Sequence, residues 1–212
     1  MKITNTIRNY TLASIMAITP VMCSRAYALC TAPLADTFEH TVSPAITPQG
    51  TDDVNALKSA PSCDITIAGE KHKAGIVVNL RDNILYTYDS EGNPTKAYLV
   101  ASGKKSTPTP EGIFVVTHKE VYPYRSAPKS TKRYKNPRDY GKYIVCLNRV
   151  NKETGERKST GYFVHGCRSY HNTFEVYPSR RVSHGCVRME EHAISEVKEV
   201  QPGTYVWFTY LY

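Results

Sequence analysis

Two identical His-Gly-Cys tripeptides occupy residues 165–167 and 184–186. Each offers an imidazole nitrogen and a thiol at positions i and i+2, which point to the same face of a strand. Together the four side chains could bind zinc as a tetrahedral Cys2His2 site. Alternatively, the two cysteines could belong to a disulfide-bearing loop, or one thiol could be a nucleophile with an imidazole as its base.

The residues around the second tripeptide favour the catalytic interpretation. A thiol nucleophile needs a nearby imidazole and donors that face the oxyanion formed when it attacks a carbonyl. Residues 183–188, Ser-His-Gly-Cys-Val-Arg, hold these parts together. Gly185 permits a tight backbone turn, and Arg188 can bind a substrate carboxylate through two nitrogens. Zinc is less favoured because paired structural zinc ligands are more often separated by about two to four intervening residues, whereas each tripeptide has a single glycine between its His and Cys.

Short β-rich segments separated by turns begin at Gly75 and must position these groups. We expect strands at 76–80, 84–88, 97–100, 113–116, 143–147, 162–165 and 204–208. The alternation of apolar and polar residues favours a mainly β domain that is antiparallel or mixed. One core helix is expected from Glu190 to about Val200. Cys186 would then precede a helix, whose first N–H groups could stabilise a thiolate or an oxyanion.

The order of these segments resembles a known family. Residues 163–166 (Phe-Val-His-Gly) and 183–188 are similar to the signature of the L,D-transpeptidase catalytic domain, also called the YkuD-like domain. Residues 75–88 resemble its opening hairpin, and residues 102–114 resemble its next landmark. The helix and final strand after Arg188 also fit, so the resemblance covers about residues 75–212.

The resemblance implies a mixed, β-sandwich-like fold with one main helix after the catalytic cysteine, and acyl transfer on peptidoglycan stem tetrapeptides. Cys186 would attack the carbonyl between the third residue and the terminal D-Ala, and D-Ala would leave. The amine of a neighbouring third residue would resolve the acyl-enzyme into a 3-3 cross-link. The alternatives are an L,D-carboxypeptidase or an amidase of the same fold, or a non-catalytic, zinc-stabilised wall-binding module.

The resemblance also assigns the two histidines. His165 is the expected general base and becomes an imidazolium beside the Cys186 thiolate. His184 is interpreted as an orienting or site-shaping residue, although it competes with His165 for the role of base. No metal and no cofactor are implied.

The remaining site residues belong to the two motif loops. Gly185 and Cys186 are expected to supply oxyanion-hole amides, Ser183 to brace the loop, and Gly166 to follow the base in its own loop. Arg188 is expected to bind a carboxylate of the substrate, with a loop-holding salt bridge as the alternative.

The N-terminus has the pattern of an export signal. Lys2 and Arg8 precede an apolar run at residues 10–23, and residues 26–28 read Ala-Tyr-Ala. We therefore expect a signal peptide at residues 1–28 and a periplasmic or cell-envelope location.

Length and composition limit the number of domains and the kinds of partner that we expect for the chain. The 212 residues suffice for one ordinary domain with appendages. Residues 29–72, rich in Thr, Pro, Ala and Ser, are expected to form an extension or linker with a short helix near residues 52–59, N-capped by Thr51. The catalytic domain would span residues 73–212. Without the signal, 27 − 3 = 24 basic residues stand against 19 acidic ones, a net charge of +5. This balance favours an anionic envelope polymer without requiring nucleic acid.

The number of cysteines left after removal of the expected signal peptide is odd. The mature chain would keep five cysteines: Cys30, Cys63, Cys146, Cys167 and Cys186. An odd number fits two disulfides and one functional thiol, although sequence does not fix the pairing. A Cys30–Cys63 bridge would close residues 29–72 on themselves, and for Cys167 we favour a bridge to Cys146. A Cys167–Cys186 bridge that switches the enzyme off is the alternative.

Residues 119–142 are strongly basic. The segment contains eight Lys and Arg residues but only two acidic residues, Glu120 and Asp139, and five tyrosines lie within residues 119–143. We interpret the segment as a lid or excursion that contacts an anionic polymer, with a merely solvated loop as the alternative. The expected partners are peptidoglycan stem peptides, or an envelope protein as acyl acceptor, and no membrane span is expected.

Overall fold

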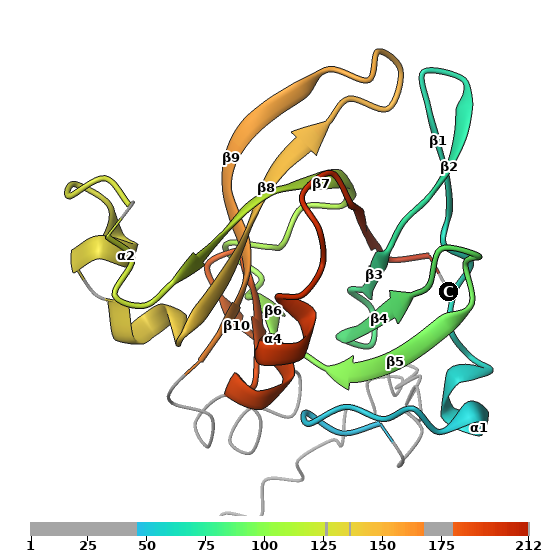
Figure 1. Cartoon of the computed structure of the whole chain (residues 1–212), viewed down its shortest axis with the longest axis horizontal. Coiled ribbons are helices and arrows are strands. Elements are labelled where there is room, and N and C mark those ends of the chain that lie inside the picture. Colours follow the sequence, from blue (N-terminus) through green and yellow to red (C-terminus); the bar gives the residue numbers. More distant parts are fainter. Residues whose placement is uncertain (1–45, 126, 136, 168–179, 212) are drawn as a thin grey trace, which may run out of the picture. The chain divides into compact units, whose positions relative to one another are not determined.

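The computed structural model describes residues 46–125, 127–135, 137–167 and 180–211 (Figure 1). The expected signal peptide and Cys30 lie outside the described residues. Within this part of the chain, no helix is both long and apolar enough to cross a membrane.

One mixed sheet of eight strands dominates the fold, in the order β11-β9-β8-β7-β12-β3-β4-β5. The strands are β3 (Ile76–Asn79), β4 (Ile84–Tyr88), β5 (Pro94–Leu99), β7 (Gly112–Val121), β8 (Tyr143–Val150), β9 (Arg157–Gly166), β11 (Val187–Met189) and β12 (Tyr205–Thr209). Within this sheet, as far as the structure describes it, only β12 with β3 and β11 with β9 pair in parallel. The expected mainly β, mixed fold with one main helix is confirmed.

The strands follow the apolar pattern of the sequence. The hairpin of β3 and β4 is confirmed, with Val77 opposite Tyr86 and both side chains buried. β7 and β9 are longer than expected, because they pair with β8 over most of its length. Their added residues are largely exposed, so apolar alternation alone does not mark them as strand.

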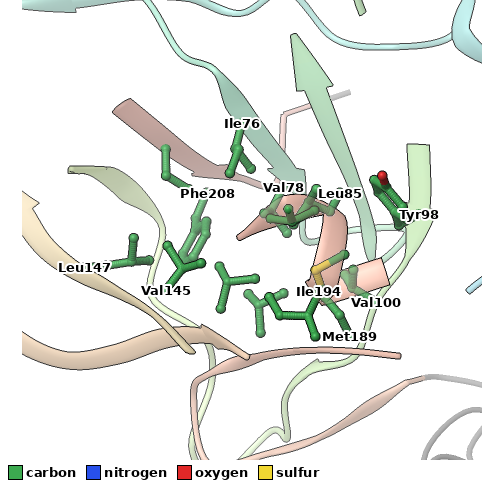
Figure 2. Close-up of a cluster of buried hydrophobic side chains, with 14 of the residues drawn as sticks. Ile76, Val78, Leu85, Tyr98, Val100, Val145, Leu147, Met189, Ile194 and Phe208 are labelled. Atoms are coloured by element: carbon green, nitrogen blue, oxygen red, sulfur yellow. The ribbon is translucent and has the colours of Figure 1, made fainter. Parts of the chain in front are cut away.

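The main core lies between the sheet and helix α4 (Glu191–Val197). Figure 2 shows Ile194 of α4 and Met189 of β11 near Val100, with Phe208 beside Val145 and Leu147. Each fully buried side chain of this size contributes about 1.5–3 kcal/mol relative to exposure. This packing fixes the end of β11, and hence the loop that precedes it.

The expected core helix from Glu190 to about Val200 is confirmed as α4 (Glu191–Val197), but an unexpected strand separates it from Cys186. Strand β11 intervenes, since Val187 and Met189 are fully buried while Arg188 between them is partly exposed. This alternation suits a short strand beside β9. Cys186 therefore lies at a strand start, and α4 begins five residues further along the chain, at Glu191.

Residues 46–73 pack on the sheet. They form α1 (Val54–Leu57) and a hairpin of β1 (Asp64–Ile67) and β2 (Glu70–Lys73). Asp53 caps α1 by accepting from the N–H groups of the next turn, so the cap expected at Thr51 is wrong. Thr51 instead bridges to Ala97 of β5.

The expected Cys146–Cys167 disulfide is also wrong, because Cys146 carries a free thiol. The register of β8 and β9 explains this result. Ile144 lies opposite His165, so Cys167 is level with Lys142, four residues from Cys146. That separation is about 13 Å along a strand, whereas bridged Cα atoms lie within about 7 Å. Cys63 and Cys186 also carry free thiols, so the structure holds no Cys30–Cys63 or Cys167–Cys186 bridge.

Two smaller features border the candidate site. β6 (Ser102–Gly103) pairs in parallel with β10 (Arg181–Ser183). Residues 122–142, called here the β7–β8 connection, contain α2 (Lys132–Lys135) and the 3-10 helix η1 (Pro137–Tyr140) (Figure 1).

Candidate active site

The loop from Ser183 to Cys186 joins β10 to β11 and has a fixed conformation. The Ser183 hydroxyl accepts the Gly185 N–H at 3.0 Å and donates to the Cys186 carbonyl at 2.6 Å. Gly185 has φ +112°, and a Cβ there would lie 2.9 Å from the Tyr162 ring. Only glycine fits this turn without strain. Since the Gly185 N–H already bonds to Ser183, it does not face an incoming oxyanion in this structure.

A second segment holds the same loop from the other side. The Lys104 N–H and the Thr107 hydroxyl both donate to the Ser183 carbonyl, at 3.0 and 3.2 Å. The Thr109 hydroxyl in turn accepts from the Gly103 N–H at 2.8 Å. The Ser102-Gly103 and Thr-Pro segments of the sequence therefore brace the loop that carries Cys186.

Strand register brings Cys186 and His165 to one face of the sheet. Val187 pairs with Val164 and Arg188 with His165 in parallel, so Cys186 is level with Phe163. Because residues two apart in a strand share a face, Cys186, His165 and Arg188 all lie on the same side. The candidate nucleophile, base and anion-binding group thus come together from two adjacent strands.

His165 is 2% exposed, and its environment keeps the ring uncharged. The pKa of His165 is lowered to about 3, first by burial and then by the Arg188 charge, while backbone hydrogen bonds to Gly166 and Tyr140 partly oppose the shift. The Nδ1 atom lies 2.6 Å from the Gly166 carbonyl oxygen. A carbonyl can only accept, so Nδ1 carries the proton and Nε2 is left as an acceptor.

Cys186 is half-buried and also uncharged in this state. Burial raises the pKa of the Cys186 thiol, and a hydrogen bond from the Phe163 backbone and the charges of Arg188 and Lys132 only partly offset this. The Sγ atom lies 3.7 Å from the Gly161 carbonyl. The pair therefore rests as thiol and imidazole, and forming the thiolate requires a proton transfer to His165 during attack.

Arg188 is held by its backbone and has an unused side-chain donor. Its N–H and C=O pair with Ala101 at 2.8 and 2.9 Å. Its Nε is buried and has no hydrogen-bond partner within the described residues. A guanidinium with a spare donor beside the nucleophile suits a carboxylate ligand.

His184 differs from His165 in exposure. It is exposed, and its pKa is lowered first by the charge of Lys104, then by desolvation and by Lys132 and Arg188. Three cations therefore surround the loop next to Cys186. This arrangement suits an anionic substrate and supports a site-shaping role for His184.

Gly166 lies directly against the Glu191 carboxylate, which would have to shift to admit a side chain at this position. A Cβ at Gly166 would lie 2.8 Å from the Glu191 carboxylate, which accepts the Lys142 N–H at 3.0 and 3.1 Å. Glu191 thus ties α4 to the end of the β7–β8 connection, directly behind the carbonyl that orients His165.

Tyr140 is a site residue that sequence reasoning missed. Its ring centroid lies 4.8 Å from that of His165 and 6.2 Å from that of Phe163. Burial raises the pKa of Tyr140, and the charge of an ionised Cys186 raises it further. The sequence showed only five tyrosines in a basic segment, and nothing distinguished Tyr140 from the others.

The two tripeptides do not form one zinc site. Cys167 would be level with Glu190 in the β9–β11 register, about 13 Å along the strand from Cys186. Among the described residues, a different group gathers possible ligands: His118, Glu120 and Cys146, with ligand atoms within 4.8 Å of one another. Glu120 already forms an ion pair with Arg133, 2.9 Å away.

A cleft lies apart from the candidate site residues. It measures about 1060 Å³ and is lined by residues including Ile65, Ile113, Val150 and Trp207. None of Cys186, His165, His184 and Arg188 lines it. We therefore assign the candidate site from the side-chain geometry rather than from cavity size.

Several known protein structures are similar to this chain. No curated protein sequence matches the chain. Similar structures include an Enterococcus faecium L,D-transpeptidase mutant (22% identity, TM-score 0.46, 65% of this chain and 50% of that one) and Bdellovibrio bacteriovorus Bd1075 (19%, 0.46, 70% and 52%). The catalytic domain of the E. faecium L,D-transpeptidase is also similar (24%, 0.41, 65% and 97%).

The chain thus spans about half the length of the first two of these proteins. The model of the L,D-transpeptidase catalytic domain matches residues 73–207, which is more than half of the sequence. The chain belongs to the L,D-transpeptidase catalytic domain family, also known as YkuD.

Proposed function

We propose that the protein is an exported cysteine acyltransferase that forms 3-3 cross-links between peptidoglycan stem peptides. The observation that carries this proposal is the shared face of Cys186, His165 and Arg188, with His165 buried and its Nδ1 bonded to a carbonyl. We further propose residues 73–212 as the catalytic domain, residues 29–72 as an extension and residues 1–28 as the export signal.

In the proposed acylation step, Arg188 binds a carboxylate of the tetrapeptide donor and places the scissile carbonyl near Sγ. The Cys186 thiol transfers its proton to Nε2 of His165 as Sγ attacks the carbonyl carbon. The imidazolium formed is stabilised by the Nδ1–H bond to Gly166. The Cys186 N–H is the donor that we assign to the oxyanion, because the Gly185 N–H is bonded to Ser183.

Collapse of the tetrahedral intermediate expels D-Ala, which takes the proton from His165. In the second step His165 accepts a proton from the amine of a neighbouring third residue, and this amine attacks the thioester. The Cys186 thiolate leaves and takes the proton from the His165 imidazolium, so the enzyme returns to its resting, uncharged pair. Attack by water instead would make the protein an L,D-carboxypeptidase.

The direct test is incubation of the purified protein with disaccharide tetrapeptides and identification of the products by mass. A cross-linked dimer with release of D-Ala is the expected result. Tripeptide alone would show hydrolysis and would replace the transpeptidase assignment by the carboxypeptidase one. An unchanged tetrapeptide would reject both. Cys186→Ala is the matched control and should give no product.

Export has a separate test. The N-terminal residue of protein recovered from the cell envelope should be Leu29, the first residue after the proposed cleavage site. Recovery of an intact Met1 from the cytoplasm alone would reject export.

A further inference from the structure

A buried ion pair ties the middle of the β7–β8 connection to the sheet. Arg133 of α2 approaches Glu120 of β7 with Nε 2.9 Å from Oε2 and a terminal nitrogen 3.1 Å from Oε1. The side chains are only 16% and 2% exposed. This contact joins a surface helix to a strand thirteen residues earlier.

The same arginine reaches the candidate site through aromatic rings. The Arg133 guanidinium carbon lies 5.1 Å from the Phe163 ring centroid, and Phe163 is level with Cys186. Tyr140 packs edge-on against Phe163 and contacts the His165 ring. The ion pair is therefore connected to the base by a continuous set of contacts: Arg133, Phe163, Tyr140 and His165.

Among the described residues, other contacts hold the connection mainly near its ends, together with Ala127, which is buried against the sheet. The Tyr124 hydroxyl donates to the Gly141 carbonyl, and Glu191 accepts the Lys142 N–H. Between these ends, Arg133 and Lys132 both make ion pairs. The Lys132–Asp139 pair lies within the connection, is 3.6 Å long and has side chains 57% and 49% exposed. Such an exposed pair contributes little, whereas removing one partner of a buried pair leaves an uncompensated charge.

We propose that Arg133 is a positioning residue whose pair with Glu120 holds the β7–β8 connection closed over the site, so that Tyr140 stays against His165. In its closed position, the β7–β8 connection covers Cys186. Its effect on turnover rests on the proposed function. Its effect on access to the thiol does not, because alkylation requires no peptidoglycan substrate.

The experiment compares Glu120→Gln, which removes the buried negative charge at nearly constant size, with Asp139→Asn, which removes the exposed one from the same segment. The folded proteins are treated with iodoacetamide, and the rate of Cys186 modification is followed by peptide mass mapping. Glu120→Gln should raise this rate about tenfold, equivalent to about 1.4 kcal/mol in the opening equilibrium. Asp139→Asn should match the wild type.

A second variant covers the case in which Glu120→Gln does not fold. Arg133→Lys keeps a positive charge but loses the planar two-nitrogen contact and the stacking on Phe163. It should raise the Cys186 alkylation rate in the same direction by a smaller factor. In tetrapeptide turnover, both variants should lower kcat more than they change KM, since the base and not the anion-binding group is disturbed.

The proposal is overturned if the Cys186 alkylation rate in the folded variants equals that of the wild type, or if Asp139→Asn raises it equally. Thermal melting of each variant identifies an effect of global unfolding, which would also modify Cys63, a buried thiol in a separate hydrophobic cluster, and would overturn the proposal. If alkylation changes as expected but no variant and no wild type turns over tetrapeptide, the positioning role stands and the proposed function fails.

Discussion

Acidification should destabilise the protein through His165. In the folded state its pKa is about 3, whereas an exposed histidine has a pKa near 6.5. Between these two values the unfolded state binds a proton that the folded state does not. The free energy of unfolding therefore rises with pH in this window and falls as the pH is lowered through about 6.5.

The magnitude follows from the two pKa values. From about pH 7 to about pH 5, protonation of the unfolded histidine stabilises the unfolded chain by about 2 kcal/mol, while the folded ring remains neutral. This result requires only that the folded pKa lie well below 5. It corresponds to a large fraction of the stability of a typical domain, about 5–15 kcal/mol.

Urea denaturation at both pH values measures the effect, with His165→Asn as the matched variant. Asn keeps an N–H donor for the Gly166 carbonyl but cannot titrate. All other ionisable groups are shared, so the wild type should lose about 2 kcal/mol more than the variant on acidification. Equal losses in the two proteins would refute the argument that His165 is buried in its neutral form.

Four further outcomes are expected. Gly185→Ala should lower both kcat and stability, because residue 185 has φ +112° and a Cβ there would lie 2.9 Å from Tyr162. The control variant Gly161→Ala has open space around its Cβ and should retain both kcat and stability. Turnover and melting assays measure the two quantities. Ser183→Ala should destabilise the fold by about 1–3 kcal/mol in urea denaturation, since two backbone groups lose their partner. Arg188→Met should raise KM for the tetrapeptide donor at least about tenfold if it binds a carboxylate, and an unchanged KM would leave it a structural role. A carbapenem should add its mass to Cys186, and an unmodified cysteine in folded protein would count against an acylatable nucleophile.

The local pattern of apolar and polar residues was sufficient to predict much of the fold. The strands around Val77 and Tyr86 were predictable because alternate or continuous apolar residues report burial directly. The hairpin at residues 64–73 was missed, since β2 reads Glu-Lys-His-Lys and has no buried residue. Strand β11 was missed because three residues are too few to reveal a period.

The candidate site also contains residues that could be predicted from the sequence and residues that could not. Cys186, His165 and Arg188 could be selected because their motif is contiguous or nearly so. Tyr140 and the Arg133–Glu120 pair could not, because their contacts depend on how a long connection folds back on the sheet. The disulfide prediction failed for a related reason, since pairing of thiols depends on strand register and not on the presence of nearby cysteines.

The central claim is that Cys186 attacks the tetrapeptide donor and carries the acyl group. Its most direct measurement is mass mapping of protein mixed with disaccharide tetrapeptide and quenched in acid within a single turnover. We predict an adduct on the peptide containing Cys186, equal in mass to the donor less D-Ala, that is absent in Cys186→Ala. Release of D-Ala without this adduct, or an adduct on Cys167 in its place, would contradict the account.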